Sequence, residues 1–142
     1  MLVLDSTVLI AALNKDRAGH QAARAVFQAD DELAVTNQTL RETLAVATRP
    51  ATANGLGLVF MVAWESVLEM REVCAVWLME DASWWAAYTE LAIQVQPTGR
   101  TIYDLGQVAA VRSLGREATL VTDDSGLMAR YGQFIKIRTL LR

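Results

Sequence analysis

The chain has 142 residues, which supports one well-buried core and is too short for two typical domains, so residues 1–142 are expected to form a single domain. Its formal net charge of −3 excludes the binding of nucleic acid through diffuse basic charge, and its single cysteine, Cys74, excludes an internal disulfide bond. Charged residues interrupt the apolar stretches of this 53% hydrophobic sequence before they reach the length that spans a bilayer, so we expect no membrane contact and a cytoplasmic location.

Short runs of β-branched and aliphatic residues alternate with longer helical segments along the whole chain. Strands are expected at residues 2–4, 33–36, 74–78, 118–121 and 134–137. Helices are expected at residues 7–13, 20–29, 37–48, 58–72, 82–94, 104–114 and 125–131. This alternation predicts an α/β fold, in which a parallel sheet is covered by helices on both faces.

Residues that commonly begin or stop helices mark several of these boundaries. Asp5 or Ser6 is expected to cap the first helix and Asn37 the third. Pro50 is expected to stop the third helix, because a proline disfavours helical geometry in the residue before it. The helix at 58–72 is expected to bury one side, formed by Val59, Val62, Ala63, Val67 and Met70.

Aspartates stand at equivalent places in this pattern: Asp5 ends the first strand, Asp104 starts a helix, and Asp123 and Asp124 end the fourth strand. In an open parallel sheet, strand ends and the helix starts that follow them converge on one crevice. Glu42 shares a helical stripe with partly apolar positions and is expected to point toward packed structure. Taken singly, each aspartate is more often a helix cap and Glu42 a surface residue, so it is their convergence that indicates a site.

Four carboxylates around one crevice repel one another, and they stay ionised together only if cations lie between them. Oxygen donors without His or Cys favour Mg²⁺ or Mn²⁺ over zinc. Such a site typically supports hydrolysis of phosphodiester bonds, because the metal activates a bound water and stabilises the leaving oxygen. The only histidine, His20, is expected at the surface at a helix start, which argues against a histidine-based catalytic set.

Five segments follow one another along almost the whole chain: "VLDSTVLIAAL", "TLRETLAVATRP", "NGLGL", "YDLGQVAAVRSLG" and "LVTDDSGL". In their order and separations they resemble the PIN-domain ribonucleases, and among these the VapC-type toxins of bacterial toxin–antitoxin pairs. The resemblance implies a three-layer α/β/α PIN-like fold with a central parallel sheet of four to five strands. It also implies a Mg²⁺- or Mn²⁺-dependent endoribonuclease that acts as the toxin of a type II pair.

The resemblance assigns the catalytic and metal-binding roles to four acids: Asp5, Glu42, Asp104 and Asp124. Asp124 is taken as the fourth because the family's last acid falls two positions after a Thr or Ser, here Thr122, although Asp123 could exchange roles with it. Thr7 matches a position that hydrogen-bonds the pocket. Thr7, Thr122 and Asp123 are therefore expected to support the site.

Three arginines close to the acids in sequence, Arg41, Arg49 and Arg100, are candidates for contacts with RNA phosphates, with ordinary surface ion pairs as the alternative. The four tryptophans are expected to pack in the core or in interfaces more often than to stack on bases (Trp64, Trp77, Trp84 and Trp85). Apolar helix surface in excess of what one core needs indicates a partner. For that partner the resemblance implies a homodimer and a cognate antitoxin.

Two other functions stay open on these grounds. The chain could be a catalytically silent PIN-like module that binds a protein and uses its acids as helix caps. It could also be a related metal-dependent DNA or flap nuclease. Divalent-ion binding that depends on Asp104 would argue against the first, and cleavage of RNA rather than DNA would argue against the second.

Overall fold

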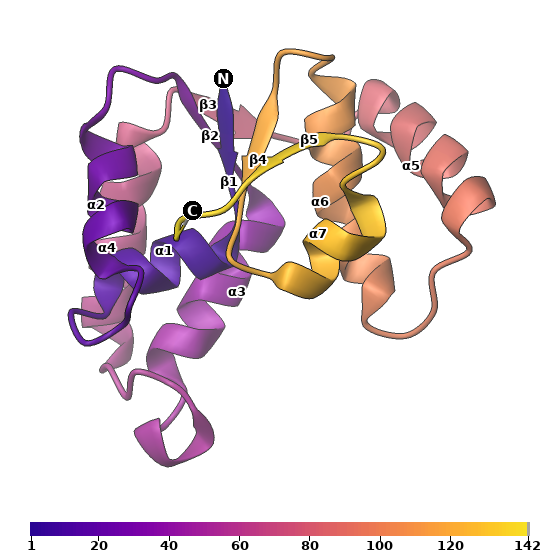
Figure 1. The fold of residues 1–142 in the computed structure, drawn as a ribbon. Coiled ribbons are helices and arrows are strands. Elements are labelled where there is room, and N and C mark those ends of the chain that lie inside the picture. The colour runs from indigo at the N-terminus through magenta and orange to yellow at the C-terminus, as the bar shows by residue number, and fades with distance from the viewer. Residues whose placement is uncertain (142) are drawn as a thin grey trace.

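The computed structural model describes residues 1–141, in which five strands alternate with seven α-helices (Figure 1). The strands are β1 (Leu2–Leu4), β2 (Leu33–Thr36), β3 (Val76–Leu78), β4 (Thr119–Val121) and β5 (Lys136–Arg138). The helices are α1 (Ser6–Leu13), α2 (His20–Gln28), α3 (Asn37–Thr48), α4 (Phe60–Val73), α5 (Ala82–Val95), α6 (Thr101–Ser113) and α7 (Ser125–Tyr131), with a 3₁₀ turn η1 (Ala51–Ala53) after α3. The predicted α/β class is confirmed.

The five strands form one parallel sheet in the order β3-β2-β1-β4-β5. The sheet grows outward from β1 on one side and from β4 on the other, so the chain changes direction between these two strands. Leu4 of β1 pairs with Val121 of β4, and the next residues, Asp5 and Thr122, therefore leave the sheet side by side. Ligands of open parallel sheets bind beyond the carboxyl ends of the strands at such a switch point.

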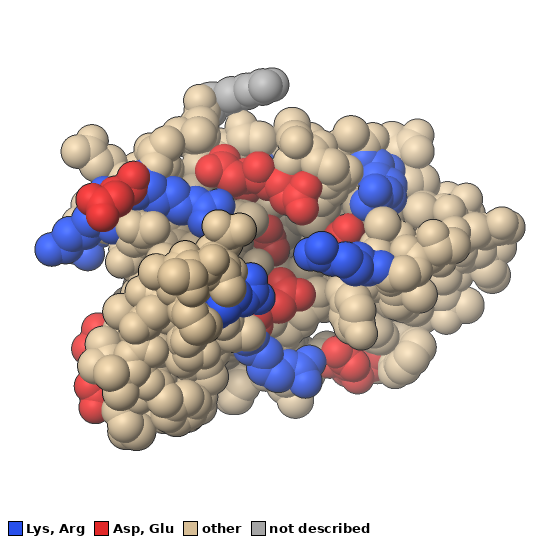
Figure 2. Space-filling model, turned by 90° about the horizontal axis from the view of Figure 1, so that it is seen from below, with Lys and Arg blue, Asp and Glu red and all other residues tan. Residues whose placement is uncertain are grey.

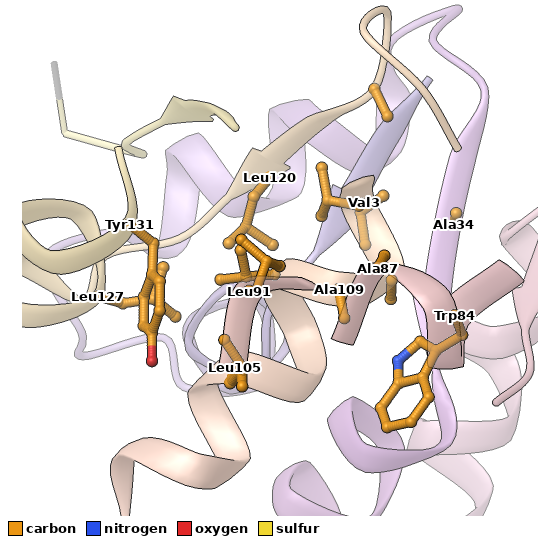
Figure 3. Packing of buried hydrophobic residues seen from close by; sticks show 14 residues of the cluster. Val3, Ala34, Trp84, Ala87, Leu91, Leu105, Ala109, Leu120, Leu127 and Tyr131 are labelled. Carbon is orange, nitrogen blue, oxygen red and sulfur yellow. The ribbon is translucent and has the colours of Figure 1, made fainter. Parts of the chain in front are cut away.

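The residues of the central strands alternate between the two faces of the sheet, as the two-residue period of a strand requires. One face packs against α5, α6 and α7 and receives Val3, Ala34 and Leu120 (Figure 3). The other face packs against α1 and α2 and receives Leu2, Leu4, Leu33, Val35 and Val121. Because the central strands β1, β2 and β4 bury side chains, and helices cover both faces of the sheet, the predicted three-layer arrangement results (Figure 1).

The cap of α3 and the start of α6 differ from the prediction. The cap of α3 is Thr36 and not Asn37, because Thr36 Oγ1 accepts a hydrogen bond from the backbone N–H of Thr39 at 3.0 Å. α6 begins at Thr101, three residues before Asp104. There the Thr101 hydroxyl donates to the carbonyl oxygen of Thr98 at 2.8 Å and accepts from its N–H at 3.0 Å, which closes an additional turn. The other boundaries shift by the small amounts usual for helix and strand ends.

The side of α4 that was expected to be buried is covered only in part. Ala63 and Val67 are buried, whereas Val59 and Val62 are 72% and 51% exposed. The helix packs against α3, and Ala63 and Val67 are its only fully buried residues, because the other expected positions do not face this contact. The expectation for Val59 and Val62 was therefore wrong, and α4 carries exposed apolar surface.

His20 and Cys74 are both half-buried. His20 begins α2, as predicted, but it is less exposed than predicted, because α2 packs against α1 and the ring donates from Nδ1 to the carbonyl oxygen of Ala11 at 2.9 Å. The Cys74 thiol donates to the carbonyl oxygen of Met70 at 3.3 Å, and burial raises the pKa of the thiol to about 11. Among the helices of residues 1–141, none is long and apolar enough to cross a membrane.

Candidate functional site

Asp5 lies at the switch point between β1 and β4, and only 5% of its surface is exposed. Its Oδ2 accepts hydrogen bonds from Thr7 Oγ1 at 2.9 Å and from Thr122 Oγ1 at 2.7 Å. Each hydroxyl oxygen accepts a backbone N–H in turn, from Asp123 to Thr7 and from Asp124 to Thr122, both at 3.0 Å. The two hydroxyl protons therefore point at the carboxylate, whose side chain makes no capping bond to α1. Asp5 therefore occupies the N-cap position of α1, as expected, but its carboxylate faces the two hydroxyls and not the N–H groups of the helix.

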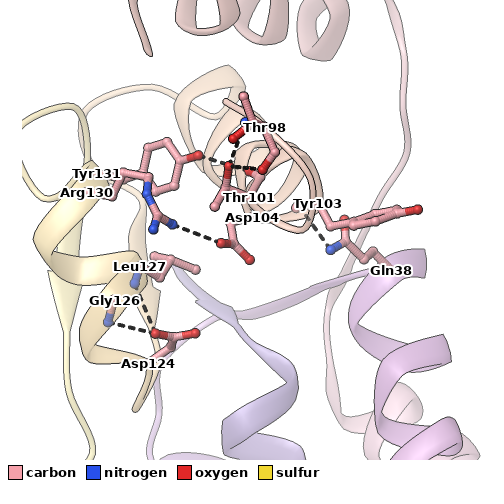
Figure 4. Close-up of polar contacts among 10 residues, drawn as sticks. All are labelled: Gln38, Thr98, Thr101, Tyr103, Asp104, Asp124, Gly126, Leu127, Arg130 and Tyr131. Atoms are coloured by element: carbon pink, nitrogen blue, oxygen red, sulfur yellow. Dashed lines mark hydrogen bonds and ion pairs between the residues drawn. The ribbon is translucent and has the colours of Figure 1, made fainter. Parts of the chain in front are cut away.

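Gln38 links the helices that carry Glu42 and Asp104. Its Nε2 donates to Glu42 Oε1 at 2.8 Å. The same Nε2 donates to the carbonyl oxygen of Tyr103 at 3.1 Å (Figure 4). A Cβ on Gly106 would lie 3.1 Å from Gln38 Oε1, so the glycine leaves the space that this amide occupies. The amide thus holds one turn of α3 against the first turn of α6, where Asp104 lies.

The two neighbouring aspartates after β4 point in different directions. Asp124 Oδ1 accepts from the N–H groups of Gly126 and Leu127 at 2.8 and 3.0 Å and caps α7, while the residue also faces the hollow described below (Figure 4). Asp123 Oδ1 instead accepts from the N–H of Leu140 at 3.3 Å. Asp124, and not Asp123, therefore shares space with the other acids.

An open hollow of about 500 Å³ lies beyond the carboxyl ends of β1 and β4. It is lined by all four acids singled out in the sequence: Asp5, Glu42, Asp104 and Asp124. Basic side chains surround the acidic depression (Figure 2), and the arginines that line it are Arg49, Arg100 and Arg130. Arg41, the third candidate for a contact with RNA phosphates, is exposed and lines a different groove, away from the acids.

The electrostatics of Asp104 show that the four acids share this space. Burial raises the pKa of Asp104 above its ordinary value, and the charge of Asp124 raises it further. Arg130 opposes this rise, with Nη1 3.2 Å from Asp104 Oδ2, whereas Asp5 and Glu42 add to it. A cation placed in the hollow would relieve this repulsion.

The chemistry of the donor set fits a hard divalent cation, because the side chains are carboxylates and hydroxyls with no His or Cys among them. The four acids line the hollow, but within residues 1–141 no group of three or more His, Cys, Asp or Glu side chains is close enough to hold a metal ion together. Binding would therefore require side chains to move inward or water to complete the coordination.

A family model of the PIN domain matches residues 2–133. The chain belongs to the PIN domain family. A search of the curated proteins found no match.

Solved structures with this PIN fold cover nearly the whole chain at low sequence identity. A chain of VapBC-1 from nontypeable Haemophilus influenzae is 18% identical, with 99% of this chain and 98% of that chain covered and a TM-score of 0.71. A chain of DNA-bound VapBC from Salmonella typhimurium is 19% identical, with 98% and 97% covered and a TM-score of 0.71. VapC20 from Mycobacterium tuberculosis, described as a toxin that cleaves the sarcin–ricin loop, is 18% identical, with 97% and 99% covered and a TM-score of 0.66.

Sequence reasoning missed three polar residues that shape the site of this PIN domain: Gln38, Gln107 and Arg130. Gln107 is 2% exposed, and its Oε1 accepts a hydrogen bond from Thr36 Oγ1 at 2.7 Å. The sequence could have indicated Gln107, because this glutamine lies one turn after Asp104 and interrupts an otherwise apolar helix face. Nothing in the local sequence marks Arg130, because its partner lies 26 residues away.

Proposed function

We propose that this PIN domain is a Mg²⁺- or Mn²⁺-dependent endoribonuclease and acts as the toxin of a type II toxin–antitoxin pair. The observation that carries the proposal is the meeting of four acids at one switch-point hollow: Asp5, Glu42, Asp104 and Asp124. Their sequence separation is large, and a cap or surface role would not require them to face the same space. The structural neighbours from VapBC complexes and VapC20, a toxin that cleaves the sarcin–ricin loop, support the choice of toxin and of RNA.

Asp5 and Asp104 are the proposed principal ligands of the cation, and Glu42 and Asp124 complete the site and position water. The bound cation would supply an activated water and stabilise the leaving oxygen of the phosphodiester. Thr7 and Thr122 orient Asp5 through its Oδ2. Because the chain is acidic overall, the arginines at the hollow supply the local positive charge for RNA phosphates, and Arg49 and Arg100 are the proposed contacts.

The test compares the wild-type chain with Asp5→Asn and Asp104→Asn on one single-stranded sequence, prepared as RNA and as DNA. Each variant should reduce cleavage of the RNA by about a hundredfold or more in Mg²⁺ or Mn²⁺, because each loses a charged ligand. Asp30→Asn is the matched control, since Asp30 is exposed and away from the hollow. Full-rate cleavage by Asp5→Asn would reject the assignment, and preferred cleavage of the DNA would favour the DNA nuclease.

One observation favours the second candidate, a catalytically silent binding module: the acids of residues 1–141 do not form a ready three-ligand cluster. The two proposals differ in what the protein does with a divalent ion. Titration calorimetry with Mn²⁺ on the wild-type chain and on Asp104→Asn separates them. Binding that is present in the first and lost in the second supports the nuclease, whereas no binding to the wild-type chain supports the silent module.

The proposed partners are a cognate antitoxin and a second copy of the chain. An apolar groove of about 820 Å³ runs between α3 and α4 and offers room for an antitoxin segment; its lining includes Leu40, Leu44, Trp64, Val67 and Trp77. On α5, Trp85 and Ile93 are 54% and 70% exposed and are candidates for the contact between copies. Light scattering of the purified chain, alone and co-expressed with the product of the adjacent gene, tests both. A monomer would contradict the homodimer, and failure to co-purify would contradict the pairing.

A further inference from the structure

Arg130 is the arginine of the hollow that already pairs with one of its acids. Its Nη1 lies 3.2 Å from Asp104 Oδ2, with 40% and 31% of the two side chains exposed (Figure 4). Arg49 and Arg100 line the same hollow, but neither forms an ion pair within residues 1–141. The three arginines are therefore not equivalent, although they contribute the same charge to one site.

The position of Arg130 is determined by a helix that is anchored on the Asp104 segment. Tyr131, the next residue, is fully buried, and its hydroxyl donates to the carbonyl oxygen of Thr101 at 3.1 Å, one turn before Asp104. At the other end of α7, Asp124 caps the helix and Leu127 is 3% exposed. A mobile surface arginine would lack these contacts. Here the packing of α7 places the guanidinium of Arg130 beside the carboxylate of Asp104.

The ion pair between Arg130 and Asp104 also affects the balance of charge in the hollow. Asp104 is repelled by Asp5, Glu42 and Asp124, and Arg130 is the group that counters this repulsion in the protein alone. A cation that binds Asp104 through Oδ2 meets an atom already engaged by Nη1. The cation and the guanidinium of Arg130 would then repel each other, which costs free energy.

We propose that Arg130 is the built-in counter-ion of Asp104 and competes with the divalent cation for that carboxylate. In the metal-free protein the guanidinium holds Asp104, and on metal binding the guanidinium must leave Oδ2. Arg130 thereby lowers the affinity for the metal and stabilises the metal-free form. This inference rests on the cation site of the proposed function but not on cleavage of RNA.

The experiment measures Mn²⁺ binding to the full chain by titration calorimetry without RNA. Arg130→Gln and Arg130→Met both remove the positive charge, the first with a polar and the second with an apolar side chain. Arg130→Lys keeps a positive charge at this position. Arg100→Gln is the matched control, because it removes a positive charge from the same hollow without breaking an ion pair. Melting temperatures in EDTA and in Mn²⁺ give a second readout and show that each variant is folded.

Arg130→Gln and Arg130→Met should bind Mn²⁺ about three- to fivefold more tightly than the wild-type chain, the upper range for a partly exposed ion pair. Arg100→Gln should change the affinity less, and Arg130→Lys should remain close to wild type. In EDTA, Arg130→Gln should melt at a lower temperature, and Mn²⁺ should raise its melting temperature by more than it raises that of the wild type.

Equal or weaker binding by Arg130→Gln, or a gain no larger than that of Arg100→Gln, would overturn the inference and leave the proposed function standing. The predicted affinities in a protein that cleaves no RNA would support the inference and reject the proposed function. Absence of Mn²⁺ binding in the wild type and in every variant would overturn both.

Discussion

Gln107 and Thr39 are joined by a hydrogen bond of 2.6 Å, from Nε2 of the amide to Oγ1 of the hydroxyl, in a part of the core that solvent does not reach. Thr39 Oγ1 donates in turn to the carbonyl oxygen of Leu4 at 3.1 Å. Leu4 precedes Asp5, Thr39 lies one turn before Glu42, and Gln107 lies one turn after Asp104. One buried polar hub therefore connects the three segments that carry these acids.

Replacing Gln107 with leucine should lower the free energy of unfolding by about 1–3 kcal/mol, because the buried hydroxyls of Thr36 and Thr39 lose their amide partner. Urea denaturation measures the loss. Gln94→Leu makes the same replacement at an exposed site of α5 and should stay within about 0.5 kcal/mol of wild type. If both variants unfold at the same urea concentration, the hub does not stabilise the fold.

Replacing Gly106 with alanine should displace the Gln38 amide, because the new Cβ would lie 3.1 Å from Gln38 Oε1. The hydrogen bond from Gln38 to Glu42 would be weakened, and kcat/KM for RNA should fall by about three- to tenfold, which corresponds to the net contribution of about 1 kcal/mol of an ordinary hydrogen bond. Stability should not fall in parallel, since alanine is favoured over glycine inside a helix by about 0.5–1 kcal/mol.

Gln38→Leu removes the same hydrogen bond directly and should produce a similar loss of kcat/KM. Combined with Gly106→Ala, it should cost little more than either change alone, because both act on one contact. Additive losses would show that Gly106 acts through a different route.

Asp124 is both a helix cap and a candidate ligand, and two substitutions separate these roles. Asp124→Asn keeps a good capping side chain, so stability should change by only a few tenths of a kcal/mol, while RNA cleavage should fall with the loss of charge. Asp124→Ala should lose cleavage and also about 1 kcal/mol of stability. Denaturation and cleavage are measured on the same preparations, and Asp124→Asn with wild-type cleavage would reduce Asp124 to a cap.

The raised pKa of Asp104 predicts a dependence of stability on pH. Between the ordinary and the raised pKa of Asp104, the folded state binds more protons than the unfolded state. Asp104 therefore does not change the free energy of unfolding at low pH, and it lowers this free energy as the pH rises through that interval. Without metal, Asp104→Asn should be more stable than wild type at about pH 7, and the difference should vanish near pH 3, below the ordinary pKa of Asp. Urea denaturation in EDTA at both pH values tests this, and an advantage independent of pH would contradict it.

The strand pattern was readable from the sequence because it depends on near neighbours. Residues 2–4 and 33–36 are short aliphatic runs between helical segments, and both became strands with the predicted bounds. A parallel sheet brings the ends of its strands to one edge, so a common location for Asp5 and Asp124 followed from that pattern as well. The N-cap of α3 at Thr36 and the start of α6 at Thr101 were harder to predict, because several neighbouring polar residues can cap a helix.

The sequence by itself determined the α/β class, the order of the elements and the edge at which the acids would gather, since these follow from local periodicity and from the geometry of parallel strands. Only the tertiary structure decided which partner each acid has. Arg130 reaches Asp104 because α7 is anchored on the start of α6, Gln38 reaches Glu42 beside Gly106, and Arg41 lies outside the hollow. Such pairings depend on how one helix is placed against another, and that placement is the sum of many contacts between residues far apart in the chain.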